Sequence, residues 1–213
     1  MFCNVWTEKK GEYVVIINGA DLNIFFPDYD ITEINEEIRF ITTGNFRNVD
    51  MIEPIVKALD LLKKDLSFKL VVAGPVKPEL QKYLSRDYII YVGTRNPEKI
   101  AEFLRKSHIF IYSHLNPPCP NSIIEAVSCG LPVVGFNSGA MSELLFFSKD
   151  LLAEVSKDLF QSYRSFDYHR LAVKIMFTVE NFPECRKRSL ENSKLYSFKE
   201  CGRKYLALFK KFY

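Results

Sequence analysis

The sequence predicts an α/β fold built on a doubly wound parallel sheet, followed by C-terminal helices. From residue 38 onward, short apolar segments alternate with helical patterns in five units of roughly 20 to 25 residues, which is typical of βαβ crossovers. Each segment is apolar along its whole length, as expected for a sheet that helices cover on both faces. Such a sheet is Rossmann-like. No repeat of the solenoid type occurs in the sequence.

The strands of this sheet are expected at apolar runs that end in glycine or polar residues. They are predicted at residues 38–42, 68–72, 88–92, 109–112 and 131–134. A further short strand is expected at residues 14–17, before a turn at Asn18 and Gly19.

Helices are expected between these strands. Asp50 and Glu53 have the spacing of a capping box before a helix that runs to about residue 62. A short helix is expected near Pro78, and Asn96 is expected to cap the next one. Asn121 is expected to cap a short helix that ends at Ser128.

The last third of the chain is predicted to be helical. Residues 168–179 and 198–212 each present an apolar, partly aromatic face, which we assign to core packing. The expected organisation is a lead-in with a short strand at residues 1–37, a Rossmann-like domain at 38–165, and helices at 166–213 that pack on the same domain.

Composition excludes several classes of protein. The chain has 213 residues, 47% hydrophobic and 26% charged, so it is not a mostly disordered chain. No apolar run reaches the roughly 18 residues of a membrane span. The net charge of +3 is too small to indicate nucleic-acid binding. Five cysteines without a C-x-x-C pair favour reduced thiols in the cytoplasm, and residues 1–10 lack the apolar core of a secretory signal.

The ligand is expected at the carboxyl ends of the strands, where open parallel sheets bind small molecules. Gly44, Gly74 and Gly93 each follow a predicted strand, so a ligand can approach the backbone there. The helix that begins near Asn121 and Ser122 offers free amides to a phosphate. The sequence contains neither G-x-G-x-x-G after the first sheet strand nor G-x-x-x-x-G-K-[ST]. A nicotinamide oxidoreductase and a P-loop nucleotidase are therefore disfavoured.

One segment is much more specific than these glycines. Residues 120–134, PNSIIEAVSCGLPVV, resemble the donor-site signature of retaining glycosyltransferases of family 4, which have the GT-B fold. Residues 17–22, 71–74, 92–93 and 139–143 resemble other segments of that family in the expected order. The resemblance covers roughly residues 14 to 212 and corresponds to the donor-binding, C-terminal half of those enzymes.

The resemblance implies roles for residues of this half. Glu125 would accept hydrogen bonds from the two ribose hydroxyls of a nucleotide sugar, because a carboxylate has two acceptor oxygens. Asn121 and Ser122, after Pro120, would face the sugar and diphosphate, although both could serve as helix caps. The remaining candidates are Gly44 and Arg47 beside the phosphates and Thr94 and Arg95 beside the base.

The sequence departs from the family pattern at the donor site. The first glutamate of the E-x(7)-E pair is replaced by Pro117, and Asn116 or His114 are candidates to take over its role. Members of the family commonly have an arginine and a lysine beside the phosphates. This sequence has Asn45 and Asp50 at those two positions. We expect Asp50 to face the amides of its own helix, because it would repel a diphosphate.

Arg47 is the basic residue that remains in this loop, and it is the best candidate to stabilise the leaving group; no other catalytic residue is assigned. No metal is expected. The D-x-D at residues 28–30 precedes the first sheet strand, and we interpret it as accidental.

The leading hypothesis is a retaining glycosyltransferase that takes its sugar from a nucleotide-diphosphate sugar. By resemblance its partners would be an N-terminal acceptor domain or a separate subunit, and an acceptor that is a sugar, lipid or polysaccharide. Peripheral association of the complete enzyme with the cytoplasmic membrane face is compatible with this. The alternative is a non-catalytic or split-subunit donor module, which the departures at Pro117, Asn45 and Asp50 favour.

Overall fold

The computed structural model describes residues 4–6, 13–155 and 167–211 of the chain. Cys3, Phe212 and the expected domain boundary between residues 165 and 166 lie outside the described residues. Within these ranges, no helix combines the length and the apolar character that a membrane crossing requires.

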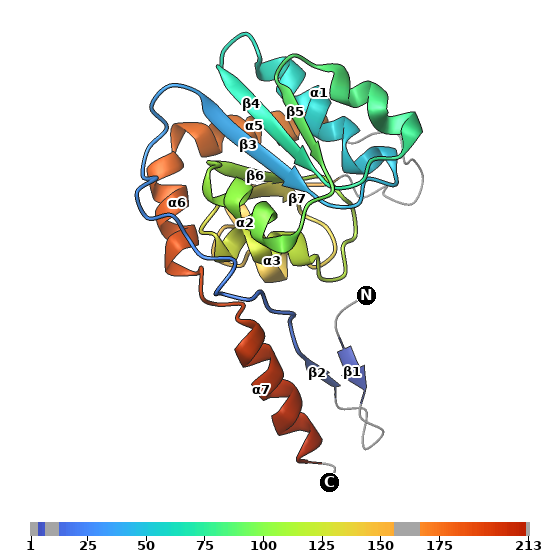
Figure 1. Ribbon diagram of the computed structural model, residues 1–213, viewed down its shortest axis with the longest axis vertical. Helices are drawn as coiled ribbons and strands as arrows, with labels where there is room; N and C mark the ends of the chain where they lie inside the picture. The colour runs from blue at the N-terminus through green and yellow to red at the C-terminus, as the bar shows by residue number, and fades with distance from the viewer. Residues whose placement is uncertain (1–3, 7–12, 156–166, 212–213) are drawn as a thin grey trace.

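A six-stranded parallel sheet forms the centre of the molecule, with the strand order β5-β4-β3-β6-β7-β8 (Figure 1). Every pair of neighbouring strands is parallel. The strands are β3 (Ile38–Thr43), β4 (Phe68–Ala73), β5 (Ile89–Gly93), β6 (Ile109–Tyr112), β7 (Val133–Phe136) and β8 (Leu152–Ala153). The predicted α/β fold with a doubly wound parallel sheet is confirmed. β7 begins and ends two residues later than predicted, and β8 was not predicted.

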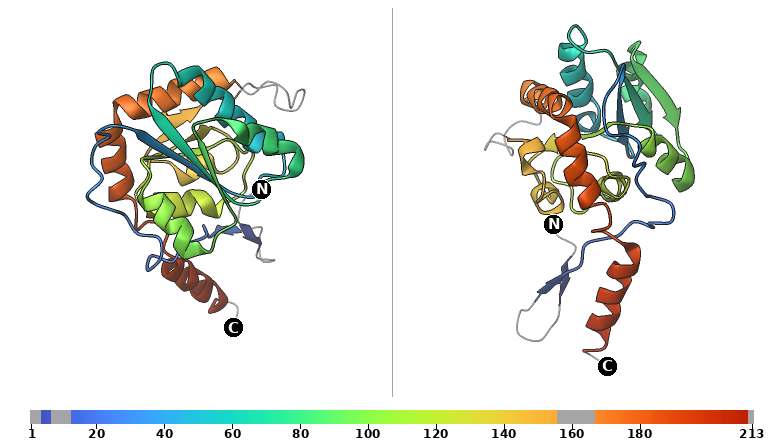
Figure 2. Two further views of the ribbon diagram at one scale, coloured as in Figure 1. Left: turned by 45° about the horizontal axis from the view of Figure 1, so that its top comes forward. Right: turned by 90° about the vertical axis from the view of Figure 1, so that its left-hand side faces the viewer.

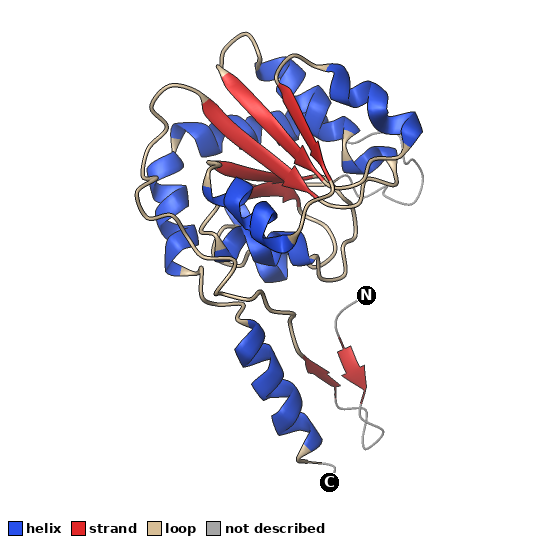
Figure 3. Ribbon diagram, in the orientation of Figure 1, coloured by secondary structure: helices blue, strands red, loops and turns tan. Residues whose placement is uncertain are grey.

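Helices cover the sheet on both faces (Figure 3). The helices are α1 (Glu53–Leu62), α2 (Pro97–Arg105), α3 (Asn121–Ser128), α4 (Met141–Leu144), α5 (Tyr168–Glu180) and α6 (Phe182–Glu191), with short 3-10 helices η1 (Val49–Met51), η2 (Pro78–Ser85) and η3 (Lys149–Leu151). Phe40 of β3 packs with α1 and α5, whereas its neighbour Ile41 packs with α2, α3 and α4. The alternation of strand side chains thus builds two hydrophobic cores.

Two of the three predicted helix caps are wrong. The side chain of Asn96 does accept a hydrogen bond from the amide of Lys99 and caps α2, as predicted. Asp50 lies on η1, while α1 begins at Glu53 without a side-chain cap. Asn121 is the first residue of α3 rather than its cap, because the helix already starts after Pro120.

The chain has a small second sheet and a long last helix outside the main sheet. β1 (Asn4–Trp6) pairs antiparallel with β2 (Tyr13–Val15), so the lead-in holds a strand that the sequence analysis missed. Helix α7 (Phe198–Phe209) projects from the sheet body on the same side as this pair (Figures 1 and 2).

The prediction that the apolar face of α7 packs in the core is wrong. Phe198 is 68% exposed and Phe209 is 53% exposed, and Leu208 is the buried residue of the helix. The physical reason is the direction of α7, which leaves the sheet body after its first turn (Figure 2). Its aromatic side chains therefore have little of this chain to pack against.

A buried arginine joins the lead-in to the body. Arg186 of α6 is 1% exposed, and its guanidinium donates hydrogen bonds to the backbone carbonyls of Asp28, Ile31 and Cys129. Burial lowers the pKa of this guanidinium. The lead-in before β3 is thus fixed to the end of α3 by one side chain.

Candidate glycosyltransferase donor site

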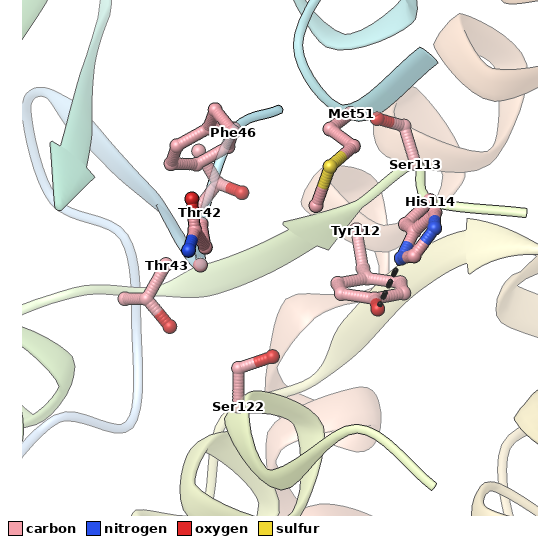
Figure 4. A pocket seen from close by; sticks show the side chains of 10 residues that line it. Thr42, Thr43, Phe46, Met51, Tyr112, Ser113, His114 and Ser122 are labelled. Atoms are coloured by element: carbon pink, nitrogen blue, oxygen red, sulfur yellow. Dashed lines mark hydrogen bonds between the residues drawn. The ribbon is translucent and has the colours of Figure 1, made fainter. Parts of the chain in front are cut away.

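The candidate site lies where the two halves of the sheet meet. β3 and β6 are neighbours, but the chain continues from β3 towards β5 and from β6 towards β8. The connections after these strands therefore diverge and leave a crevice at their carboxyl ends, the usual position of a ligand in open α/β sheets. A pocket of about 190 Å³ is found there (Figure 4). The described residues that line it are Thr42, Thr43, Gly44, Asn45, Phe46, Met51, Tyr112, Ser113, His114 and Ser122.

Glycines let the loops at this edge come close to one another. A Cβ on Gly74 would lie 1.9 Å from the carbonyl oxygen of Gly44, and Gly74 has a φ of +124°. A side chain at Gly74 is therefore excluded on two grounds. Nothing lies within 4 Å of the position that a Cβ on Gly44 would take, so the Gly44 backbone faces open space.

The start of α3 forms the opposite wall of the pocket. Ser122 is the second residue of α3 and lines the pocket directly. The first amides of a helix have no partner within the helix and carry the positive end of its dipole. Asn121 beside it does not line the pocket; its Oδ1 accepts a hydrogen bond of 3.0 Å from Asn18 Nδ2.

Glu125 lies one turn further along α3. It is three residues after Ser122, so both residues lie on the same side of the helix. Glu125 is half-buried, and burial raises the pKa of its carboxyl group. The site therefore holds a partly desolvated carboxyl beside the pocket, which an incoming hydroxyl group could satisfy.

A second carboxylate, that of Asp50, is buried on the residue that precedes the lining residue Met51. Asp50 is 4% exposed, and its Oδ1 has no hydrogen-bond partner among the described residues. Its backbone carbonyl accepts a hydrogen bond of 2.8 Å from Ser113 Oγ. The expectation that its carboxylate faces the amides of its own helix is wrong, because η1 separates it from α1.

One side-chain hydrogen bond joins two residues of the pocket wall. The hydroxyl of Tyr112 lies 3.3 Å from Nδ1 of His114 (Figure 4). Tyr112 is 8% exposed, and burial, with a smaller contribution from the charge of Asp50, raises the pKa of its hydroxyl group. Tyr112 thus remains a neutral hydroxyl beside His114.

Comparison with known proteins identifies the family of this chain. Residues 37–161 match the family described as "Glycosyl transferases group 1". The chain belongs to this family. The match includes the strands that border the pocket and all of α3.

The curated relative below is about twice as long as this chain. This chain is 25% identical over 224 residues to the protein named "Probable sucrose-phosphate synthase" of Thermosipho melanesiensis, an alignment that covers 99% of this chain and 50% of that protein. The chain spans about half the length of the curated relative it matches.

Solved structures share its fold. The sucrose-phosphate synthase of Thermosynechococcus elongatus superposes with a TM-score of 0.74 at 21% identity, over 97% of this chain and 54% of that one. Anabaena Alr3699/HepE in complex with UDP and glucose superposes with a TM-score of 0.73 at 14% identity, over 93% of this chain and 57% of that one. The fold is that of GT-B glycosyltransferases.

The structure brings together some of the residues that the sequence singled out. Gly44 and Ser122 line the pocket, and Glu125, which is not among the lining residues, lies one turn after Ser122 on α3. Of the two candidates for the missing first glutamate, His114 lines the pocket. Asn116 lies outside the lining; it has a φ of +49° and its amide donates to Ser138 Oγ.

Other predicted residues lie away from the pocket. Arg47 is exposed and is absent from the pocket lining. Thr94 and Arg95 are exposed, and the Arg95 guanidinium donates to the carbonyl of Thr94 at 2.9 Å. Pro120 precedes α3 and is half-buried. Whether these residues contact a ligand remains a prediction.

Two side chains of the pocket were not predicted because they lie inside the strands. Thr42 is the residue before the end of β3, and Tyr112 is the last residue of β6. Their signal was their position, since the last residues of parallel strands border the ligand crevice. They were hidden inside runs that the hydrophobic pattern assigns to the core.

A larger hollow of about 570 Å³ opens at the other end of β3. Its lining includes four acidic residues, Asp30, Glu33, Glu36 and Glu37. These four carboxylates outnumber the one arginine of the lining, Arg39, so the hollow repels a diphosphate and does not compete as a donor site. Within the described ranges, no cluster of three or more potential ligands could hold a metal ion.

Proposed function

We propose that this chain is the donor-binding half of a retaining, family 4 glycosyltransferase, which transfers a sugar from a nucleotide-diphosphate sugar to an acceptor. One observation carries the proposal: the pocket of a group 1 glycosyltransferase domain lies at the switch point of its sheet, between Gly44 and the first turn of α3. Helix amides and an open glycine backbone suit a diphosphate.

In this proposal different residues bind different parts of the nucleotide sugar. Glu125 accepts hydrogen bonds from the ribose hydroxyls, and its buried carboxyl gains partners when the nucleotide binds. The first turn of α3, with Pro120, Asn121 and Ser122, faces the diphosphate and sugar. Arg47 approaches the leaving diphosphate from the loop after β3, while Thr94 and Arg95 border the base.

Transfer requires a second half that binds the acceptor. The chain spans 50% of the sucrose-phosphate synthase relative, which leaves room for another domain in proteins of that length. Phe146, Phe198, Leu206 and Phe209 are exposed on α7 and near α4, which favours a covering partner on that side. We expect little turnover from this chain by itself, and an acceptor that is a sugar, a lipid or a polysaccharide.

Titration of the chain with nucleoside diphosphates tests the proposal. UDP is the first probe, because UDP is the ligand named for the Alr3699/HepE structure. We expect UDP to bind at micromolar to millimolar concentration and Glu125→Ala to weaken binding at least about tenfold, the effect of losing charge-assisted hydrogen bonds. Glu191→Ala, an exposed carboxylate on α6, is the matched control and should bind like the wild type.

The same experiment can contradict the proposed donor site. If UDP, GDP and ADP all give no heat and no NMR shift at millimolar concentration, the donor-site proposal is wrong. If Glu125→Ala binds UDP as tightly as the wild type does, the nucleotide binds at another surface.

A second candidate function is a module that pairs with a separate acceptor-binding subunit without catalysing transfer. It is favoured by the pocket lining, in which no lysine or arginine occurs among the described residues, and by Asn45, Asp50 and Pro117. Under this alternative the chain forms a stable complex with its partner subunit, and Glu125→Ala leaves that complex intact. Transfer by the reconstituted pair, lost in Glu125→Ala, would rule the alternative out.

A further inference from the structure

We propose that His114 supplies the side-chain hydrogen bond to the donor diphosphate that lysine or arginine would otherwise provide, and that Tyr112 is its positioning residue. The inference rests on the proposed function, because it needs a nucleoside diphosphate in the pocket. It adds a role for two residues at the end of β6.

The geometry places both side chains on the pocket. Tyr112 and His114 are two residues apart at the carboxyl end of β6, so they point to the same side of the extended chain, while Ser113 between them donates its hydroxyl to the Asp50 carbonyl. Figure 4 shows the imidazole of His114 beside the phenol of Tyr112, across the pocket from Ser122. A ligand at the first turn of α3 would therefore face the His114 ring.

The hydrogen bond between the two residues decides which ring nitrogen of His114 carries the proton. The Tyr112 hydroxyl is buried, and its raised pKa keeps it protonated. Among the described residues, Nδ1 of His114 at 3.3 Å is its side-chain partner. If Nδ1 carried the proton, the buried hydroxyl would lose its acceptor, at a cost that proteins avoid.

The hydroxyl therefore donates to Nδ1, which leaves the ring N–H on Nε2. Nε2–H is then a donor that is free to serve a ligand. Tyr112 acts here as backbone carbonyls and carboxylates do for many functional histidines, by fixing the tautomer and the plane of the ring.

The electrostatic surroundings make this donor important. Thr42, Thr43, Ser113 and Ser122 contribute neutral hydroxyls to the pocket, and the described lining includes no lysine or arginine. The buried side chain of Asp50 is that of the residue before Met51, and the Asp50 carbonyl accepts from Ser113 Oγ of the lining. Within this lining a diphosphate is therefore held by amides and neutral donors, among which Nε2–H is the one on a rigid ring, while Arg47 approaches from outside the lining. Hydrogen bonds to a charged acceptor are roughly twice as strong as neutral ones.

Substitutions that move the hydrogen-bond donor of residue 114 by one carbon test the inference. In His114→Gln the side-chain amide can reach the place of Nε2, whereas in His114→Asn it reaches the place of Nδ1. We expect UDP affinity to fall about tenfold or more in His114→Asn and to be restored to within about threefold in His114→Gln. Tyr112→Phe removes the positioning hydroxyl. As a single substitution it should weaken UDP binding about threefold, and added to His114→Asn it should weaken binding no further.

Two further measurements separate binding from structure. Affinity for uridine, which has no phosphate, should be the same in the wild type and His114→Asn by ligand-observed NMR. The ¹⁵N signals of the His114 ring should report Nε2–H in the wild type and a mixture of tautomers in Tyr112→Phe. Thermal unfolding of each variant shows whether it is folded, and His169→Gln on α5 is the control for loss of a histidine.

The outcomes are distinct. If wild-type chain fails to bind UDP, GDP and ADP, the donor site itself is wrong. If it binds UDP and His114→Asn binds equally well, or if uridine binding falls in parallel, the role of His114 is wrong and the donor site stands. If another nucleoside diphosphate binds better than UDP, the same comparison is made with that nucleotide and its nucleoside. A wild-type ring with the proton on Nδ1 overturns the role of Tyr112.

Discussion

A Cβ atom on Gly19 would lie 2.3 Å from the backbone nitrogen of Phe198. The two chain segments touch there because the amide of Ala20 donates to the carbonyl of Tyr196, and the amide of Phe198 donates to the carbonyl of Ala20, both at 2.8 Å. This contact connects the lead-in to the first residue of α7.

Gly19→Ala is expected to break this contact. Backbone atoms cannot move aside for a methyl group as a flexible side chain can, so we expect the free energy of unfolding to fall by about 1 to 3 kcal/mol. Hydrogen exchange at the amides of Ala20 and Phe198 should speed up. Gly202→Ala is the control, because nothing lies within 4 Å of its added methyl group and alanine favours a helix. Unchanged exchange in Gly19→Ala would contradict the close approach.

Two adjacent residues of α7 test how that helix packs. Leu208 is 5% exposed and Phe209 is 53% exposed. Leu208→Ala should lower the free energy of unfolding by about 2 to 3 kcal/mol, whereas Phe209→Ala should change it by less than about 0.5 kcal/mol. Denaturant unfolding measures both. Equal losses would show that Phe209 is covered in solution, as it would be in a dimer of this chain.

Removal of the Arg186 guanidinium should destabilise the protein strongly. Arg186→Met leaves the carbonyls of Asp28, Ile31 and Cys129 without this donor, and we expect the free energy of unfolding to fall by about 3 kcal/mol. Arg203→Met, an exposed arginine on α7, should have almost no effect. Similar unfolding midpoints for the two variants would disprove this role of Arg186.

His108 should make the fold sensitive to acid. Its ring is 4% exposed, and Nδ1 accepts a hydrogen bond of 3.0 Å from the amide of Arg39, so the ring is neutral in the folded state. Burial, with the charges of Arg39 and Arg186, lowers the pKa of His108 from 6.5 to about 4. As the pH falls between these values the unfolded chain takes up a proton that the folded chain does not, so stability is lost by up to about 3 kcal/mol.

The matched variant for this prediction is His108→Asn, which keeps an acceptor near the position of Nδ1. The difference in unfolding free energy between wild type and variant should shrink as the pH is lowered from about 6.5 to about 4. Urea titrations at several pH values measure it. A difference that stays constant with pH would contradict a neutral buried ring.

Neutralising Asp50 should strengthen donor binding. Its charge repels a diphosphate by about 3 kcal/mol at roughly 6 Å and an effective dielectric of about 20. We expect Asp50→Asn to raise UDP affinity at least about tenfold, measured by calorimetry. Asp65→Asn, an exposed carboxylate after α1, should leave affinity unchanged. Weaker UDP binding in Asp50→Asn would mean that the carboxylate is a ligand of the donor instead.

The sheet could be predicted because its strands are largely apolar and because β3, β4 and β5 end at or directly before a glycine. β8 has two residues and gives no pattern of its own, so it was missed. The aromatic face of α7 has the same periodicity whether it packs on its own sheet or on another surface. Sequence periodicity reports that a face is apolar, and only the direction of the helix shows what can cover it.

The candidate site was predicted in part for a similar reason. Gly44 and Ser122 have local signals, a glycine after a strand and the start of a helix. Tyr112 ends β6 and His114 follows it outside the strand, so their contact depends on the local geometry of the chain after β6. The burial of Asp50 could not be read from the sequence, because a capping box and a separate turn of 3-10 helix begin with the same residues.

The pairing of Ala20 with Ser197 has a mechanical consequence. One segment enters the sheet body at this point and another leaves it, and the two are tied by a pair of 2.8 Å hydrogen bonds. A rotation of α7 therefore also moves the lead-in segment around Ala20. Either both segments turn together about this point, or the two hydrogen bonds break before α7 can change its direction.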